Sequence, residues 1–170
     1  MRYDMKTCCF FGHRKVDSAP ALKTKLSLLI EDLITNRGFD TFLFGSRSEF
    51  NSLCYEVVSE LKEKHPHIKR IYVRGEYPDI DDDYKKLLLK HYEETCFPEK
   101  VRGAGRLSYV VRNREMILKS ELCVIYYNEE YLPSSRKSSF PPQSTVPKSG
   151  TRLAYEYARQ KKKEIINIFK

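Results

Sequence analysis

The stretch Thr7-Cys8-Cys9-Phe10-Phe11-Gly12-His13-Arg14 decides the fold of this chain. Its first five residues are uncharged and mostly bulky, and a glycine ends the run. A short apolar run bounded by glycine is typical of a parallel strand that is buried on both faces. Gly12 permits a sharp turn and a close approach to the backbone. We therefore expect His13 and Arg14 at the carboxyl end of a buried strand, where open parallel sheets bind their ligands.

The same plan recurs along the chain. Short apolar runs predict further strands at 41–44, 68–73, 122–127 and 164–169. Apolar residues at helical spacing predict helices at about 20–36, 50–64, 82–94, 107–119 and 149–160. This alternation indicates an α/β fold: a single doubly wound, Rossmann-like domain over 1–170, with a mainly parallel five-stranded sheet flanked by helices. Right-handed crossovers favour the strand order 3-2-1-4-5, with the opening stretch at the centre.

The composition is that of an ordinary globular protein. The chain has 170 residues, of which 41% are hydrophobic and 32% charged, enough for one domain with a full core. No run approaches the roughly 20 apolar residues of a membrane span, and the first residues lack the apolar segment of a signal peptide. We therefore expect a cytoplasmic protein without a membrane partner. The net charge of +8 favours anionic partners such as nucleotides or nucleic acid.

The cysteines and histidines indicate neither disulfides nor a metal. There are five cysteines and no Cys-x-x-Cys pair, which favours buried reduced thiols. Cys8 and Cys9 are neighbours in a strand, so they point to opposite faces and are poorly placed to pair. The four histidines show no ligand spacing relative to the cysteines. We therefore expect no metal and no cofactor, apart from a nucleotide ligand.

Polar residues suited to anions follow the predicted strands. The candidate binding residues at this edge of the sheet are Gly12, His13, Arg14, Gly45, Ser46, Arg47, Arg74, Arg112, Ser149, Gly150 and Thr151. Arginine suits phosphate because its planar fork bonds two oxygens at once. The helix starts at 46–48 and 149–151 offer free backbone N–H groups. Each feature alone is weak, since surface ion pairs and structural histidines are common, but their joint placement predicts an anion-binding cleft.

The segment 128–148 has a different composition. Four prolines and six serines lie between Asn128 and Gly150, with hardly any periodicity. This predicts a long, mobile loop. Two interpretations stay open: a lid that brings Arg136, Lys137 and Lys148 over a ligand, or a surface insertion.

Several motifs resemble those of the SLOG superfamily, and most closely its YpsA-like branch. They are Cys-Cys-Phe-Phe-Gly-His-Arg at 8–14, Phe-Leu-Phe-Gly-Ser at 42–46, Glu-Phe-Asn at 49–51, Arg-Asn-Arg-Glu-Met at 112–116 and Ser-Gly-Thr at 149–151. The resemblance implies a Rossmann-like fold that binds nucleotides or nucleotide-derived ligands such as AMP, ADP-ribose or NAD. It implies a sensor or binding module, and relatives that form dimers lead us to expect a homodimer.

Two alternative functions come from the same relatives. LOG phosphoribohydrolases, which are nucleotide N-glycosidases, need a carboxylate near the ribose. The resemblance places that glutamate at Ala154, and Glu156 is turned about 200° around a helix. The convenient carboxylates that remain are Glu49, Glu76 and Glu115, of which Glu115 is the weak catalytic candidate. DprA-like binding of single-stranded nucleic acid is the second alternative. The charge of +8 and the 12 tyrosines allow it, but the basic residues are spread along the chain rather than gathered in one patch.

Overall fold

The computed structural model describes residues 5–131 and 148–169. The predicted loop at 128–148 therefore lies mostly outside the described residues, as do Arg136 and Lys137. Within the described ranges, no helix combines the length and the apolar character that crossing a bilayer requires.

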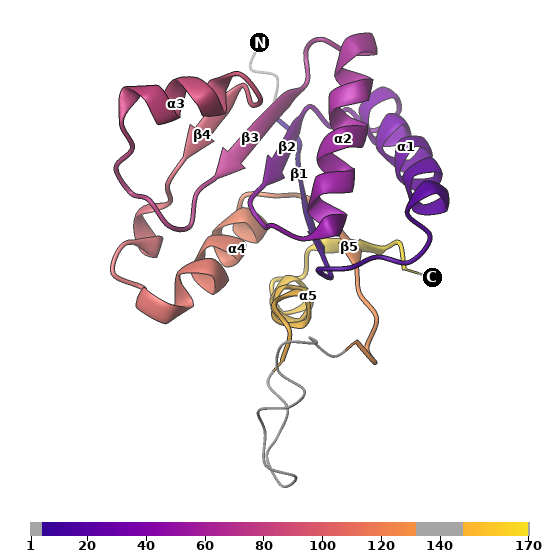
Figure 1. The fold of residues 1–170 in the computed structure, drawn as a ribbon. Coiled ribbons are helices and arrows are strands. Elements are labelled where there is room, and N and C mark those ends of the chain that lie inside the picture. Colours follow the sequence, from indigo (N-terminus) through magenta and orange to yellow (C-terminus); the bar gives the residue numbers. More distant parts are fainter. Residues whose placement is uncertain (1–4, 132–147, 170) are drawn as a thin grey trace, which may run out of the picture.

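Parallel strands form one six-stranded sheet in the order β4-β3-β2-β1-β5-β6. The strands are β1 (Thr7–Gly12), β2 (Thr41–Phe44), β3 (Lys69–Val73), β4 (Glu94–Cys96), β5 (Leu122–Tyr126) and β6 (Glu164–Asn167). The predicted α/β class is confirmed. The five expected strands follow one another in the expected order, and β1 lies inside the sheet between β2 and β5 (Figure 1).

The prediction of five strands is wrong at one edge, where β4 adds a sixth. The sequence predicts a helix that continues to about residue 94, whereas α3 (Asp82–Leu89) ends earlier. The chain then turns and pairs with β3, with Cys96 opposite Val73. A strand of three residues, Glu-Thr-Cys, is too short to show an alternating pattern.

Four longer helices cover the two faces of the sheet. They are α1 (Ala19–Thr35), α2 (Glu49–Lys64), α4 (Ser108–Leu118) and α5 (Gly150–Gln160). Figure 1 shows α1 and α2 together on one face, and α4 with α5 on the other. Two short 3-10 turns, Glu99–Val101 and Gly105–Leu107, connect β4 to α4.

The alternating side chains of β1 divide between two apolar cores. Cys8 and Phe10 pack with α1 and α2, whereas Cys9 and Phe11 pack with α4 and α5. Burial on both faces explains why the strand is apolar throughout. It also separates the two neighbouring thiols, as the sequence predicts, and every cysteine of the chain is free.

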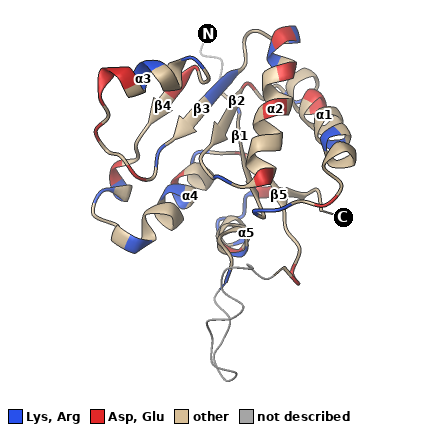
Figure 2. Ribbon diagram, viewed as in Figure 1, with Lys and Arg blue, Asp and Glu red and all other residues tan. Residues whose placement is uncertain are grey.

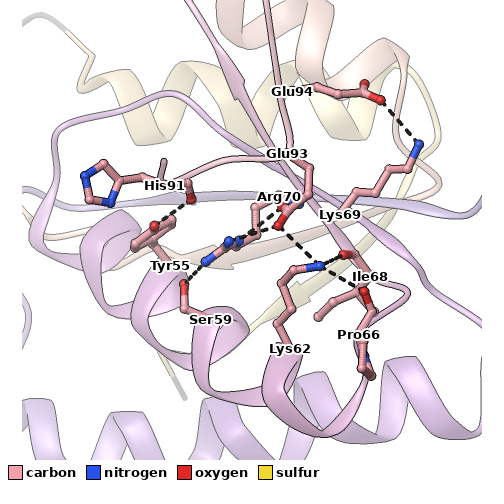
Figure 3. A network of polar contacts seen from close by, with 10 residues as sticks. All are labelled: Tyr55, Ser59, Lys62, Pro66, Ile68, Lys69, Arg70, His91, Glu93 and Glu94. Atoms are coloured by element: carbon pink, nitrogen blue, oxygen red, sulfur yellow. Dashed lines mark hydrogen bonds and ion pairs between the residues drawn. The ribbon is translucent and has the colours of Figure 1, made fainter. Parts of the chain in front are cut away.

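A network of charged side chains ties β3 and β4 to α2 (Figure 3). Arg70 donates from Nε and Nη2 to the two carboxylate oxygens of Glu93, at 3.1 and 2.9 Å. Lys62 Nζ lies 3.2 Å from the same carboxylate, and Arg70 also donates to Ser59 Oγ at 3.0 Å. Although partial burial of Glu93 opposes it, this set of donors lowers the pKa of Glu93 to about 2. The network fixes the segment that bears β4, and Thr95 of that strand in turn holds Arg74, a residue of the site described next.

Candidate functional site

Two adjoining cavities lie at the carboxyl edge of the sheet. The smaller, of about 260 Å³, lies among the ends of β2 and β3, α3 and α4, and we call it the Arg112 cavity. The larger, of about 450 Å³, lies among the ends of β1 and β2, α4 and the start of α5, and we call it the α5 cavity. Both are lined by Arg14, Ser46, Arg47 and Tyr109, so the two cavities share a wall.

Every predicted binding residue lines one of these cavities or both. The residues of the Arg112 cavity are Arg14, Gly45, Ser46, Arg47, Arg74 and Arg112. Those of the α5 cavity are Gly12, His13, Arg14, Ser46, Arg47, Ser149, Gly150 and Thr151. Figure 2 shows basic segments in α4 and in the loop after β2. The structure therefore brings the predicted residues together, and the binding of a ligand by them stays a prediction.

Arg112 is a buried cation without an anionic partner among the residues that the structure describes. Its side chain lies on α4 and is only 5% exposed. Its Nε and Nη2 donate to Asn113 Oδ1 at 3.3 and 3.2 Å, and its guanidinium lies 5.1 Å from the ring centre of Tyr109. No carboxylate in the described part of the chain forms an ion pair with it, and burial lowers its pKa to about 10. Burying an unpaired charge costs several kcal/mol, so this position favours an anion in the cavity.

Two glycines make room for the Arg112 guanidinium. A Cβ atom at Gly45 would lie 3.1 Å from Arg112 Nε, and one at Gly75 would lie 3.2 Å from Arg112 Nη1. Neither glycine has a positive φ, so a turn does not require them. Gly45 therefore serves the site by admitting the arginine beside it.

Arg74 holds a loop rather than offering its full fork to a ligand. Its Nε donates to the carbonyl of Tyr77 at 3.0 Å, and Nη2 donates to that of Pro78 at 3.2 Å. Its Nη1 donates to Thr95 Oγ1 at 3.1 Å on β4. Arg74 thus contributes positive charge to the Arg112 cavity, but most of its hydrogen-bonding capacity is already used to connect the loop after β3 to β4.

His13 is a buried, neutral side chain in the wall of the α5 cavity. It is 2% exposed, and its Nε2 accepts a hydrogen bond from the backbone N–H of Asn128 at 2.7 Å. The imidazole stacks on Tyr131, with 3.9 Å between ring centres. Burial lowers its pKa to about 4. His13 therefore fixes the chain that leaves β5, and at neutral pH it adds no charge to the site.

The buried imidazole makes stability depend on pH in mildly acidic solution. The unfolded chain takes up a proton near pH 6.5, whereas folded His13 resists it down to pH about 4. Unfolding therefore binds a proton in this window, and the free energy of unfolding falls as pH drops from 6.5 to 4, by about 3 kcal/mol for this group. Urea titrations across the window measure the slope. His13→Phe keeps an aromatic ring and removes the proton, so an unchanged slope in that variant would contradict the assignment.

The start of α5 presents polar groups to the larger cavity. Ser149 Oγ accepts a hydrogen bond from the N–H of Arg152 at 3.0 Å and so caps the helix. Thr151 is buried, and Gly150 has open space beside it. Lys148 also lines this cavity, although its Nζ lies 2.8 Å from Glu156.

Gly12 has a structural role that differs from the predicted one. A Cβ atom there would lie 2.3 Å from the ring of Phe50 on α2. The group that approaches this backbone closely is therefore a core phenylalanine. Its φ is not positive, so the backbone conformation by itself does not require a glycine at this position.

The weak catalytic candidate lies away from both cavities. Glu115 lines neither of them, and its carboxylate is 3.6 Å from Lys100. Glu76 is the one carboxylate among the described lining residues, and it lies 3.5 Å from Nη2 of Arg47. The described walls are therefore strongly cationic, with little provision for acid–base chemistry.

Sequence reasoning missed the aromatic walls of the Arg112 cavity and one arginine of the α5 cavity. The tyrosines of the smaller cavity are Tyr72, Tyr77, Tyr84 and Tyr109, and Arg106 lines the larger one. The abundance of tyrosine in the sequence was the available signal. It could not be assigned to a cavity, because these tyrosines come from β3, the loop after it, α3 and α4.

No protein-family model and no curated protein matches this chain. Function is therefore inferred from the side chains around the two cavities. In the described ranges no three His, Cys, Asp or Glu side chains gather as they would to hold a metal. What the cavities do offer is positive charge, planar aromatic faces and a capped helix start, which suit an anionic ligand that carries a ring.

Proposed function

We propose that this protein binds a nucleotide or nucleotide-derived ligand, such as AMP, ADP-ribose or NAD, at the carboxyl edge of its sheet, as a sensor or binding module. The observation that carries the proposal is the buried guanidinium of Arg112, which no described carboxylate balances and which lies in a cavity lined by tyrosines. A phosphate supplies the missing charge, and a base or ribose supplies a surface for the tyrosines. The resemblance to the YpsA-like branch of the SLOG superfamily supports the same class of ligand.

Exposed arginines at the shared wall of the two cavities add positive charge that a phosphate can reach from solution. Arg14 is exposed and lines both cavities. The side chain of Arg47 is 82% exposed, so its 3.5 Å ion pair with Glu76 is a weak one that a phosphate can replace. Such side chains attract a phosphate from solution, whereas Arg112 holds it once water has been displaced. The proposed ligand thus meets exposed arginines at the shared wall and a buried arginine inside the Arg112 cavity.

Nucleotide binding is tested by calorimetry and thermal shift with AMP, ADP-ribose and NAD. We expect at least one of them to raise the melting temperature, because a ligand at 100 times its Kd adds about 2.7 kcal/mol of stability. Arg14→Ala should weaken binding about tenfold, the loss of a charge-assisted hydrogen bond. Arg159→Ala is the matched control, because Arg159 is exposed on α5 and lines neither cavity.

The results of these experiments distinguish nucleotide binding from N-glycosidase activity. No binding of any of these nucleotides at millimolar concentration would overturn the proposal. Release of free adenine from AMP, followed by chromatography, would instead favour the N-glycosidase.

A further inference from the structure

The two cavities contain two cationic subsites on either side of a shared wall. One is centred on the guanidinium of Arg112, between the ends of β2 and β3. The other is formed by the start of α5 together with Arg14, Arg47 and Arg106. A ligand with a single anionic group occupies one subsite and leaves the charge of the other without a partner.

The first subsite is small and closed on one side. Its volume of about 260 Å³ is below the roughly 300–1,000 Å³ that is usual for a whole drug-sized ligand. Gly45 and Gly75 lie directly against Arg112, so the guanidinium is held in place by backbone. Its Nη1 makes no hydrogen bond to any residue that the structure describes. This subsite therefore fits one anionic group, with Nη1 as a free donor.

The second subsite is larger and has no carboxylate among its described lining residues. Arg106 and Arg14 are exposed and form no ion pair within the described ranges. The first N–H groups of α5 add the partial positive charge of a helix start. A buried side chain of the same wall, His13, has an Nδ1 without a described partner. The arginines and the helix start together provide donors for a second anionic group.

A ring can connect the two subsites. Tyr109 lines both cavities and is 46% exposed. The guanidinium of Arg112 lies over this tyrosine, with 5.1 Å between its central carbon and the ring centre. Arg14 and Ser46 line both cavities as well. The shared wall therefore offers an aromatic edge and hydrogen-bonding groups between the two anion positions.

We infer that the ligand carries two anionic groups on opposite sides of a sugar or ring, as in a nucleoside 3′,5′-bisphosphate. This inference rests on the proposed function and adds the class of nucleotide. A nucleoside diphosphate has comparable charge on two adjacent phosphates, whereas the inferred ligand carries its charges on opposite sides of a ring. Separation of the charges, rather than their number, is thus the property that the site selects.

Calorimetry of the full chain with adenosine 3′,5′-bisphosphate, ADP and AMP at one ionic strength tests this inference. We expect the bisphosphate to bind more than fivefold more tightly than either ADP or AMP. A ratio of fivefold or less to either of them would overturn the two-subsite inference. If AMP or ADP still binds, the proposed function stands. If none of the three binds, the two-subsite inference fails, and the proposed function fails with it only when ADP-ribose and NAD do not bind either.

Variants of Arg112 test whether its subsite causes the difference in affinity between the bisphosphate and AMP. Arg112→Met removes one subsite, so the affinity ratio of bisphosphate to AMP should fall to nearly one, whereas Arg112→Lys keeps a charge and should keep part of the ratio. Arg159→Ala should leave the ratio unchanged. A ratio that persists in Arg112→Met would overturn the role of that subsite. The comparison of ligands on the unmodified protein decides the main question even if a variant folds poorly.

Discussion

Replacing Glu93 by glutamine should lower the free energy of unfolding by about 3 kcal/mol at pH 7. Glu93 accepts two hydrogen bonds from the Arg70 guanidinium and a third from its backbone N–H at 2.7 Å, and Lys62 lies beside it (Figure 3). The amide keeps the shape of the carboxylate but leaves the half-buried cation of Arg70 unbalanced. Urea titration measures the loss without adding salt that would screen the charges.

The neighbouring residue provides a matched control. Glu94 also faces a cation, with 3.3 Å to Lys69 Nζ, but the two side chains are 54% and 45% exposed. An exposed pair contributes about 0–1 kcal/mol, so Glu94→Gln should change stability by less than about 0.5 kcal/mol. Similar losses in the two variants would show that the network of Figure 3 has no special strength.

The same carboxylate predicts that the free energy of unfolding falls steeply in acid. Folded Glu93 has a pKa of about 2, whereas an unfolded glutamate has a pKa of about 4.3. The unfolded chain binds the proton first as pH falls, so the stability contributed by Glu93 is present above pH about 4.3 and is lost toward pH 2. Glu93→Gln should flatten the stability profile in this window, which lies below the window assigned to His13.

Gly12→Ala should be the second severe substitution, with a loss of about 3 kcal/mol. The added Cβ would lie 2.3 Å from the Phe50 ring and 2.5 Å from Phe50 Cβ. Rotating the ring cannot relieve the contact with Cβ, which is fixed to the backbone of α2. The strand β1 and the helix must therefore move apart in the core. Thermal and urea unfolding measure the cost.

Gly150→Ala is the control for this substitution. Apart from its chain neighbours and the backbone of its own helix, no described residue comes within 4 Å of a Cβ built there, and φ is not positive. The residue begins α5, where alanine is a good helix former. We expect a change of less than about 0.5 kcal/mol. A loss equal to that of Gly12→Ala would mean that the close approach of Phe50 is not the cause.

The sheet and the gathering of the predicted residues follow from local pattern plus topology. The buried run at 8–11 and the alternation of strands with helices predict a parallel sheet, and parallel sheets bring their carboxyl ends to one edge. Residues placed after different strands, such as Arg14, Arg47 and Arg74, therefore line adjoining cavities. The sequence does not predict the parts of the fold to which no such rule applies. The strand β4 is too short to carry a pattern, and it is held by Arg70 and Glu93 across 23 residues of sequence.

The sequence by itself determined the α/β class, the central position of β1 and the set of residues at the carboxyl edge, because these depend on periodicity and on the handedness of crossovers. Only the tertiary structure decided what each residue does there. In the folded chain, Gly12 leaves space for the ring of Phe50, and Arg74 donates to the carbonyl of Tyr77 in the loop after β3. Arg112 is buried without a described anionic partner. Such roles depend on which side chains meet across distant segments, and no local pattern contains that information.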